Sequence, residues 1–147
     1  MAAHSQKSIF IADDDSQLVR ALSIRCQRLG LNVRNAYDSV TALTHIHAQP
    51  PDFICLDVNL PGGNGLSLCE MLCSDDRTAR IPKIILTGRS DPDTIRRCHT
   101  MCAYYVEKSP NVWDRLGPLL CELLGQQTAP QACSATTSFA IPTTDNS

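Results

Sequence analysis

Residues 53–64, with the sequence FICLDVNLPGGN, decide the fold of this chain. A short apolar run leads into the carboxylate of Asp57, and Pro61-Gly62-Gly63 ends the extended segment soon afterwards. A continuous apolar run bounded by turn residues is typical of a strand buried in a parallel sheet. An Asp at the carboxyl end of such a strand lies where open α/β sheets form their ligand crevice. Asp57 is therefore a candidate functional residue, with a helix cap or turn as the structural alternative.

Length and charge narrow the class of protein. A chain of 147 residues corresponds to one domain. Its net charge of −2 provides no electrostatic reason to expect nucleic acid or an anionic membrane as a partner. There is no apolar run of the roughly 20 residues that a membrane span needs, and the N-terminus lacks a signal-peptide pattern. We therefore expect a cytoplasmic protein.

Apolar runs and helical spacings alternate along the whole chain. Short apolar runs predict strands at residues 8–12, 53–57, 83–86 and 104–106, and an alternating apolar and polar stretch predicts a further strand at 31–36. Apolar residues at three- and four-residue spacing predict helices at residues 17–29, 40–48, 66–74, 92–101 and 112–124. This alternation predicts an α/β fold, with one parallel sheet covered by helices on both faces.

Several residues indicate where helices begin or change direction. Ser16 is a candidate N-cap of the first helix, and Asp91-Pro92 is a start signal for the fourth. Pro118 lies inside the last predicted helix, so we expect a kink there or a separate first turn.

The composition changes near the C-terminus. Residues 126–147 are rich in Thr, Ser, Ala, Gln and Pro and contain no Lys or Arg. Such a segment buries too little apolar surface to order itself. We expect an N-terminal extension at residues 1–7, a folded domain at 8–125 and a disordered tail at 126–147.

Eight cysteines raise the question of a metal site. Two pairs, Cys69 with Cys73 and Cys98 with Cys102, have helical spacing and could together form a four-thiolate zinc site. In a reducing compartment, cysteines at such spacing are more often small buried hydrophobic residues. We therefore expect them to belong to the core.

Polar side chains follow four of the predicted strands. Asp13 and Asp14 follow the first strand, Asp57 the third, Thr87 the fourth and Lys108 the fifth. Because the carboxyl ends of parallel strands meet at one edge, these groups converge. Each has an ordinary explanation by itself, as a helix start, a turn cap or a surface charge. Together they predict a functional site.

The chemistry of this set is restricted. Clustered carboxylates need a counter-cation, and hard oxygen ligands favour Mg²⁺. A carboxylate beside Mg²⁺ can attack a phosphoryl group in line and form an acyl phosphate. Mg²⁺, the Lys108 ammonium and the Thr87 hydroxyl would balance the charge on the transferring oxygens. Asp57 is the candidate nucleophile because its strand is the most apolar.

Four stretches of the chain resemble those of response regulator receiver domains of bacterial two-component systems, of the single-domain chemotaxis-regulator type. The matching stretches are IADDDS at 11–16, CLDVNLPGGNG at 55–65, ILTG at 85–88 and YYVEKSP at 104–110. The resemblance implies a flavodoxin-like (βα)5 fold with a five-stranded parallel sheet in the order 2-1-3-4-5.

The resemblance also implies a role for each site residue. Asp57 would be the phospho-acceptor, and Asp14, with Asp13, would bind Mg²⁺ together with the backbone carbonyl of Asn59. Thr87 and Lys108 would contact the phosphoryl group. Tyr105, three residues before Lys108, would form a coupled switch with Thr87.

This chain departs from the family pattern at two places. The family usually has Pro directly after the Lys, with a cis peptide bond, whereas here the order is Lys108-Ser109-Pro110. A cis bond before Ser costs about 3 kcal/mol, so either it is held by its surroundings or the turn is altered. Met101-Cys102 replaces the usual Gly-Ala before the fifth strand, and we expect a reshaped end of the fourth helix.

The expected function is a stand-alone receiver that is phosphorylated by a sensor histidine kinase or a histidine phosphotransfer protein. It would signal to a protein target through its fourth helix, fifth strand and fifth helix, or act as a phosphate shuttle or sink. The alternative is a receiver-like interaction module that works without phosphorylation. A hydrolase is disfavoured, because Asn59 occupies the position where a second acid would be needed.

Overall fold

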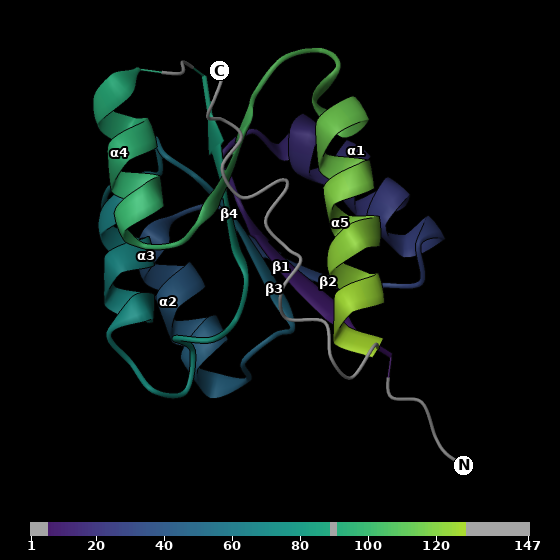
Figure 1. Cartoon of the computed structure of the whole chain (residues 1–147), viewed down its shortest axis with the longest axis horizontal. Coiled ribbons are helices and arrows are strands. Elements are labelled where there is room, and N and C mark those ends of the chain that lie inside the picture. The colour runs from purple at the N-terminus through teal and green to yellow at the C-terminus, as the bar shows by residue number, and fades with distance from the viewer. Residues whose placement is uncertain (1–5, 89–90, 129–147) are drawn as a thin grey trace.

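In the described part of the chain, five parallel strands form one sheet (Figure 1). The structure is a computed structural model that describes residues 6–88 and 91–128. The strand order is β2-β1-β3-β4-β5, as the resemblance implied. The strands are β1 (Ser8–Ala12), β2 (Asn32–Ala36), β3 (Phe53–Asp57), β4 (Lys83–Thr87) and β5 (Tyr104–Glu107). The predicted flavodoxin-like α/β fold is therefore confirmed.

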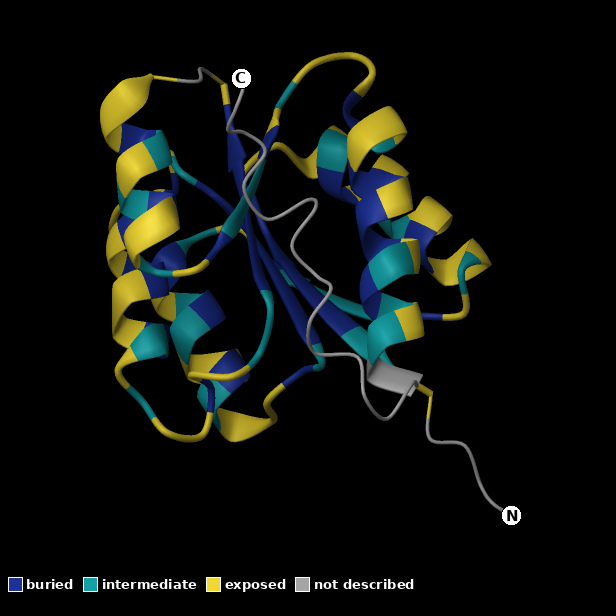
Figure 2. Cartoon of the chain, in the orientation of Figure 1, coloured by how far each residue is buried: buried dark blue, intermediate teal, exposed yellow. Residues whose placement is uncertain are grey.

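Helices cover both faces of this sheet. They are α1 (Ser16–Arg28), α2 (Ser39–Ala48), α3 (Gly65–Cys73), α4 (Pro92–Thr100) and α5 (Val112–Thr128). In Figure 1, α1 and α5 lie on one side of the strands, and α2, α3 and α4 lie on the other. Figure 2 shows that the strands between these layers are largely buried. None of the described helices has the length and apolar character that a membrane crossing requires.

The two core layers follow from the two-residue repeat of the strands. Phe53 and Cys55 of β3 belong to the apolar cluster under α1 and α5, whereas Ile54 and Leu56 belong to the cluster under α2, α3 and α4. All five residues of β3 are buried. A strand covered on both faces has no polar side, which explains the continuous apolar run in its sequence.

Side-chain caps define where the helices begin. Asp15, rather than the predicted Ser16, caps α1, because its carboxylate accepts hydrogen bonds from the N–H groups of Gln17 and Leu18. Ser16 is instead the first helical residue. The predicted Asp91-Pro92 start of α4 is confirmed, with Asp91 accepting from the N–H of Thr94.

The last helix is longer than predicted. It runs through Pro118 to Thr128 as one element, so the alternative of a separate first turn is wrong. Residues 126–128, which we had assigned to the tail, belong to α5. The remainder of that tail, residues 129–147, lies outside the described residues.

The cysteines mostly pack as small apolar side chains. Cys26, Cys55, Cys69 and Cys98 are buried, and every described cysteine is a free thiol. Within residues 6–88 and 91–128, the one group of three or more potential metal ligands consists of carboxylates. The thiolate zinc site is therefore absent from this part of the chain, and Cys133 lies outside it.

One buried charge was not anticipated from the sequence. Lys83, the first residue of β4, is only 3% exposed. Its ammonium donates to the carbonyls of Thr78, Ala79 and Ile81, at 2.8, 3.2 and 2.8 Å. Burial lowers the pKa of this group. The side chain thus holds the connection from α3 to β4 against the sheet.

The turn from α4 to β5 has an unusual backbone conformation. Met101 caps the C-terminus of α4, and the next residue, Cys102, has a φ of 56°. Glycine is favoured at this position of a helix end, because a Cβ atom in the left-handed region costs roughly 1–2 kcal/mol. Cys102 thus has a side chain at a position whose backbone conformation glycine adopts more easily.

Replacing Cys102 with Gly should therefore stabilise the protein. We expect Cys102→Gly to raise the free energy of unfolding by about 1 kcal/mol, since relief of the strain outweighs the extra entropy of Gly in the unfolded chain. Urea unfolding followed by circular dichroism would measure the change. Cys102→Ala keeps the Cβ atom and is the control. An equal gain in both variants would assign the effect to the thiol instead.

Candidate functional site

Three carboxylates meet at the carboxyl edge of the sheet. One oxygen each from Asp13, Asp14 and Asp57 lies within 4.8 Å of the other two. Asp13 and Asp57 are almost fully buried, with 0% and 2% of their surface exposed, whereas Asp14 is exposed. The sequence predicted this convergence, and the parallel pairing of β1 with β3 produces it.

Lys108 provides the positive charge at this site. Its ammonium lies 3.0 Å from Oδ2 of Asp13 and 3.3 Å from Oδ2 of Asp57. The Lys108 N–H donates to the carbonyl of Thr87 at 2.7 Å, which fixes the residue where β5 ends. The carboxylates of two strands are thus joined by one cation from a third.

The turn after Lys108 differs from the family pattern, but the Lys108 ammonium still lies beside the carboxylates. No peptide bond is cis in the described ranges, so the bond from Lys108 to Ser109 is trans. The hydroxyl and carbonyl of Ser109 accept hydrogen bonds from the N–H groups of Asn111 and Val112. Of the two outcomes considered for this turn, the altered geometry is the one observed.

Burial dominates the electrostatics of Asp13. Desolvation raises the pKa of its carboxyl group, and the charge of Asp57 adds to the effect, although hydrogen bonds from Asp15 and Lys108 oppose it. Burial alone would lower the pKa of Lys108, but its contacts with Asp13 and Asp57 outweigh that and raise it. Lys108 therefore stays protonated beside the two carboxylates.

The donor set fits a hard divalent cation. Oδ2 of Asp13 is buried and accepts no hydrogen bond, although the Lys108 ammonium is near it. A buried carboxylate oxygen without a hydrogen bond is costly unless a further positive charge is near it. Three clustered carboxylates suit Mg²⁺, which binds oxygen ligands and retains several waters. The residues present therefore match a magnesium site.

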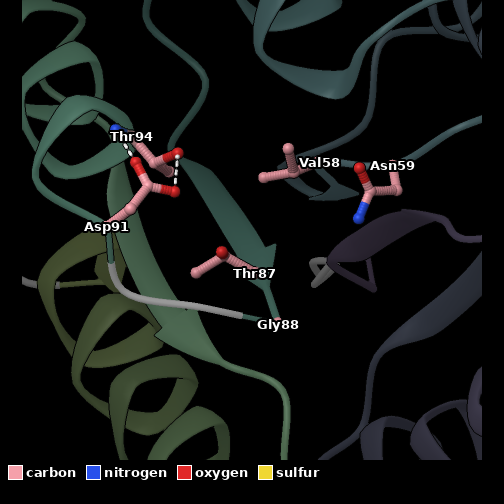
Figure 3. A pocket seen from close by; sticks show the side chains of 6 residues that line it. All are labelled: Val58, Asn59, Thr87, Gly88, Asp91 and Thr94. Carbon is pink, nitrogen blue, oxygen red and sulfur yellow. Dashed lines mark hydrogen bonds between the residues drawn. The ribbon is translucent and has the colours of Figure 1, made fainter.

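A polar cavity opens between the ends of β3 and β4 and the start of α4 (Figure 3). Its volume is about 390 Å³, and its lining residues are Val58, Asn59, Thr87, Gly88, Asp91 and Thr94. Asp91 and Thr94 were not predicted to lie here. The Asp-Pro signal identified the start of α4 but could not show that this helix begins over the edge of the sheet.

Three further predicted site residues are Asn59, Thr87 and Tyr105. The N–H of Asn59 donates to Oδ1 of Asp57 at 3.2 Å. Thr87 is buried at the end of β4 and lines the cavity. Tyr105 pairs in register with Ile85 and packs on the cluster under α2, α3 and α4. By strand alternation it shares that face of the sheet with Thr87.

Gly65 allows α3 to start directly against the phospho-acceptor candidate. The N–H of Gly65 donates to the carbonyl of Val58 at 2.8 Å. A Cβ atom at this position would lie 1.9 Å from the backbone oxygen of Asp57. No side chain fits there unless the helix moves away from β3.

Comparison with known sequences identifies a family. The profile of the response regulator receiver domain matches residues 9–112. Protein RcaC of Microchaete diplosiphon is 36% identical over 86 residues, which are 58% of this chain and 13% of that protein. The DNA-binding dual master transcriptional regulator RpaA of Synechocystis is 31% identical over 125 residues, which are 84% of this chain and 52% of RpaA. The chain thus spans about half or less of these curated relatives.

Solved structures have the same fold. A putative response regulator from Chloroflexus aurantiacus is 27% identical, with a TM-score of 0.69, over 80% of this chain and 99% of that chain. A two-component response regulator from Clostridium difficile has a TM-score of 0.76 at 22% identity, over 84% and 100% of the two chains. At 22% identity, the likeness to the second structure shows the fold alone.

The contact of Gly65 with the backbone of Asp57 predicts a large effect of a single methyl group. We expect Gly65→Ala to lower the free energy of unfolding by roughly 3 kcal/mol or more, because backbone rather than a flexible side chain must move. Gly88→Ala is the control, since a Cβ atom there meets nothing within 4 Å. Thermal or urea unfolding of both variants measures the difference, and equal stabilities would contradict the close approach.

The buried charge of Asp13 predicts that its removal stabilises the protein without Mg²⁺. The unfolded-state pKa is about 3.8 and the folded-state pKa is higher, so ionised Asp13 weakens the fold once the pH rises through this interval. We expect Asp13→Asn to be more stable than the wild type at pH 7, and this advantage to vanish below pH 3.8.

Magnesium should stabilise the wild type more than the variant. At 100 times its dissociation constant, Mg²⁺ should stabilise the wild type by about 2.7 kcal/mol and the variant by clearly less. Unfolding curves with and without MgCl₂ over this pH range test both statements. A destabilised Asp13→Asn at pH 7 without Mg²⁺ would contradict the assigned electrostatic cost.

Proposed function

The chain belongs to the response regulator receiver domain family, and we propose that Asp57 is its phospho-acceptor. Receiver domains are phospho-accepting signalling modules of two-component systems rather than turnover enzymes. The observation that carries the proposal is the position of Asp57. Its buried carboxylate ends the central strand, lies 3.3 Å from the Lys108 ammonium and belongs to the three-carboxylate cluster.

The residues around Asp57 have separate roles in the transfer. The Asp57 carboxylate attacks the phosphorus in line while the bond to the donor breaks, so an acyl phosphate forms on Asp57. Lys108 and the Thr87 hydroxyl contact the phosphoryl oxygens and balance their charge. Asp13, Asp14, Asp57 and the backbone carbonyl of Asn59 would hold Mg²⁺. When bound, this cation neutralises negative charge on the carboxylates and the phosphoryl group.

Phosphorylation would be read out on the face formed by α4, β5 and α5. Thr87 lines the cavity and ends β4, while Tyr105 lies on the same face of the neighbouring strand. A movement of Thr87 toward the phosphoryl group opens space that Tyr105 fills by turning inward. The two side chains thus form a coupled switch that changes the surface around α4 and β5.

The proposed partners follow from this chemistry. Receiver domains interact with histidine kinases, and we assign a sensor kinase or a histidine phosphotransfer protein as the phosphohistidine donor. The proposed receiver runs from residue 8 to the end of α5 at residue 128, three residues beyond the predicted boundary, and the signal passes to another protein. Nucleic acid and membrane are not among the proposed partners.

The observation that favoured the phosphorylation-independent alternative no longer supports it. It rested on the Lys108-Ser109-Pro110 sequence, which could have moved the cation out of the site. Lys108 instead contacts both Asp13 and Asp57. Turnover of external phosphate esters is disfavoured as well, since Asn59, two residues after Asp57, cannot act as the acid that such turnover needs.

Intact mass after incubation with acetyl phosphate and Mg²⁺ tests the proposal. We expect one added phosphoryl group that is lost in alkali, because an acyl phosphate is labile there. EDTA should prevent the adduct, since Mg²⁺ neutralises the charge of the attacking carboxylate cluster.

Asp57→Asn is the matched variant, because it keeps the size of the side chain and removes the nucleophile. We expect no adduct on it. An adduct of equal yield on Asp57→Asn would refute the assignment of Asp57. The absence of any adduct on the wild type, with another receiver labelled in parallel, would favour the phosphorylation-independent module.

A further inference from the structure

A second hollow lies between the C-terminal end of α1 and one side of α5. Its volume is about 380 Å³, and it is lined by Leu29, Trp113, Asp114, Gly117, Pro118 and Cys121. Leu29 and Trp113 are partly buried and pack on the core cluster under α1 and α5. The lining is thus mainly apolar, with Asp114 as its one charged residue.

Trp113 forms a fixed wall of this hollow. A Cβ atom on Gly117 would lie 2.8 Å from two atoms of the indole ring, so the ring rests directly on the backbone of that glycine. The guanidinium of Arg25 lies 5.8 Å from the ring centroid, within the range of a cation–π contact. These two contacts hold the indole in place while part of it remains accessible.

The C-terminal segment of the same chain has matching chemistry. Within residues 129–147, Phe139 and Ile141 are the only large apolar side chains, and they stand close together in the sequence SFAIP at 138–142. The segment carries one charged residue, Asp145, which lies beyond this stretch. An uncharged, apolar pentapeptide is the kind of occupant that an apolar hollow takes.

The distance from the end of α5 to the hollow also matches the span of the chain that leads to residues 138–142. Helix α5 ends at Thr128, and Cys121 and Trp113 lie about 10 and 22 Å back along its axis, at 1.5 Å per residue. A flexible linker as long as residues 129–138, ten residues, has a root-mean-square span of about 16–19 Å. A tether whose span matches the separation gives effective concentrations on the order of millimolar, so even a weak contact is populated.

We propose that residues 138–142 of this chain dock intramolecularly into the hollow formed by Leu29, Trp113, Pro118 and Cys121. Phe139 and Ile141 provide the apolar contacts, and the docked segment covers the surface between α1 and α5. The contact leaves Asp57 and its cavity untouched, because no residue lines both hollows. The docked segment therefore occupies this face and leaves the phosphoryl transfer unchanged.

The fluorescence of Trp113 provides the first test, because it is the only tryptophan of the chain. In the full-length double variant F139S/I141S, we expect the emission to shift to longer wavelength, since water replaces the apolar segment. A132S/A135S, which changes two small residues of the same segment, should emit like the wild type. A synthetic peptide of residues 129–147 added to F139S/I141S should reverse the shift. Identical spectra for all three proteins would overturn the proposal.

Disulfide trapping provides the second test. In full-length Cys133→Ser with Ala140→Cys, which keeps both Phe139 and Ile141, mild oxidation should join position 140 to the exposed Cys121 faster than to Cys102, which is exposed on the turn after α4. Peptide mass spectrometry distinguishes the two products. Equal yields of both products would overturn the docking. Cross-linked dimers that disappear on dilution would also overturn it, because they would assign the hollow to a second copy.

Acetyl phosphate labelling separates this inference from the proposed function. F139S/I141S should accept the phosphoryl group at the rate of the wild type, since the two hollows share no residue. A changed rate would contradict the stated independence of the two sites. A failure of Asp57 to label at all would leave the fluorescence and trapping results unaffected.

Discussion

The functional edge of this protein depends on the balance of charge between clustered carboxylates and a single ammonium group. Asp13 and Asp57 are both buried, and within the described residues Lys108 is the cation that pairs with them. Two buried anions and one cation leave an excess of negative charge, which is costly in a medium of low polarity. This excess of negative charge at the carboxyl edge of the sheet lowers the stability of the fold, and a bound cation would offset it.

Strand alternation sorts the functional groups onto two faces. Asp13, Asp57 and Lys108 continue the residues that face α1 and α5, whereas Thr87 and Tyr105 continue those that face α4. The charged cluster and the switch pair are thus on opposite sides of the same sheet edge. In the proposed function, a phosphoryl group on Asp57 would act on α4 through Thr87, while Lys108 on the other face would contact the same group.

Much of this arrangement could be predicted from the order of residues. The apolar run before Asp57, the alternation of strands and helices, and the polar residues after four strands all depend on local patterns. The Lys108-Ser109 turn could not be decided in this way, because its geometry depends on what surrounds it. The cap of α1 was placed one residue late, since Asp15 and Ser16 are both good caps and neighbouring contacts select between them.

The sequence by itself determined the sheet, its covering helices and the identity of the charged groups, because periodicity and residue type carry that information. The tertiary structure alone decided that Asp91 lies over the cavity, that Lys83 is buried against three carbonyls, and that Gly65 rests on the backbone of Asp57. These features join segments that are distant along the chain. Their physical cause is close packing between elements, which no local pattern records.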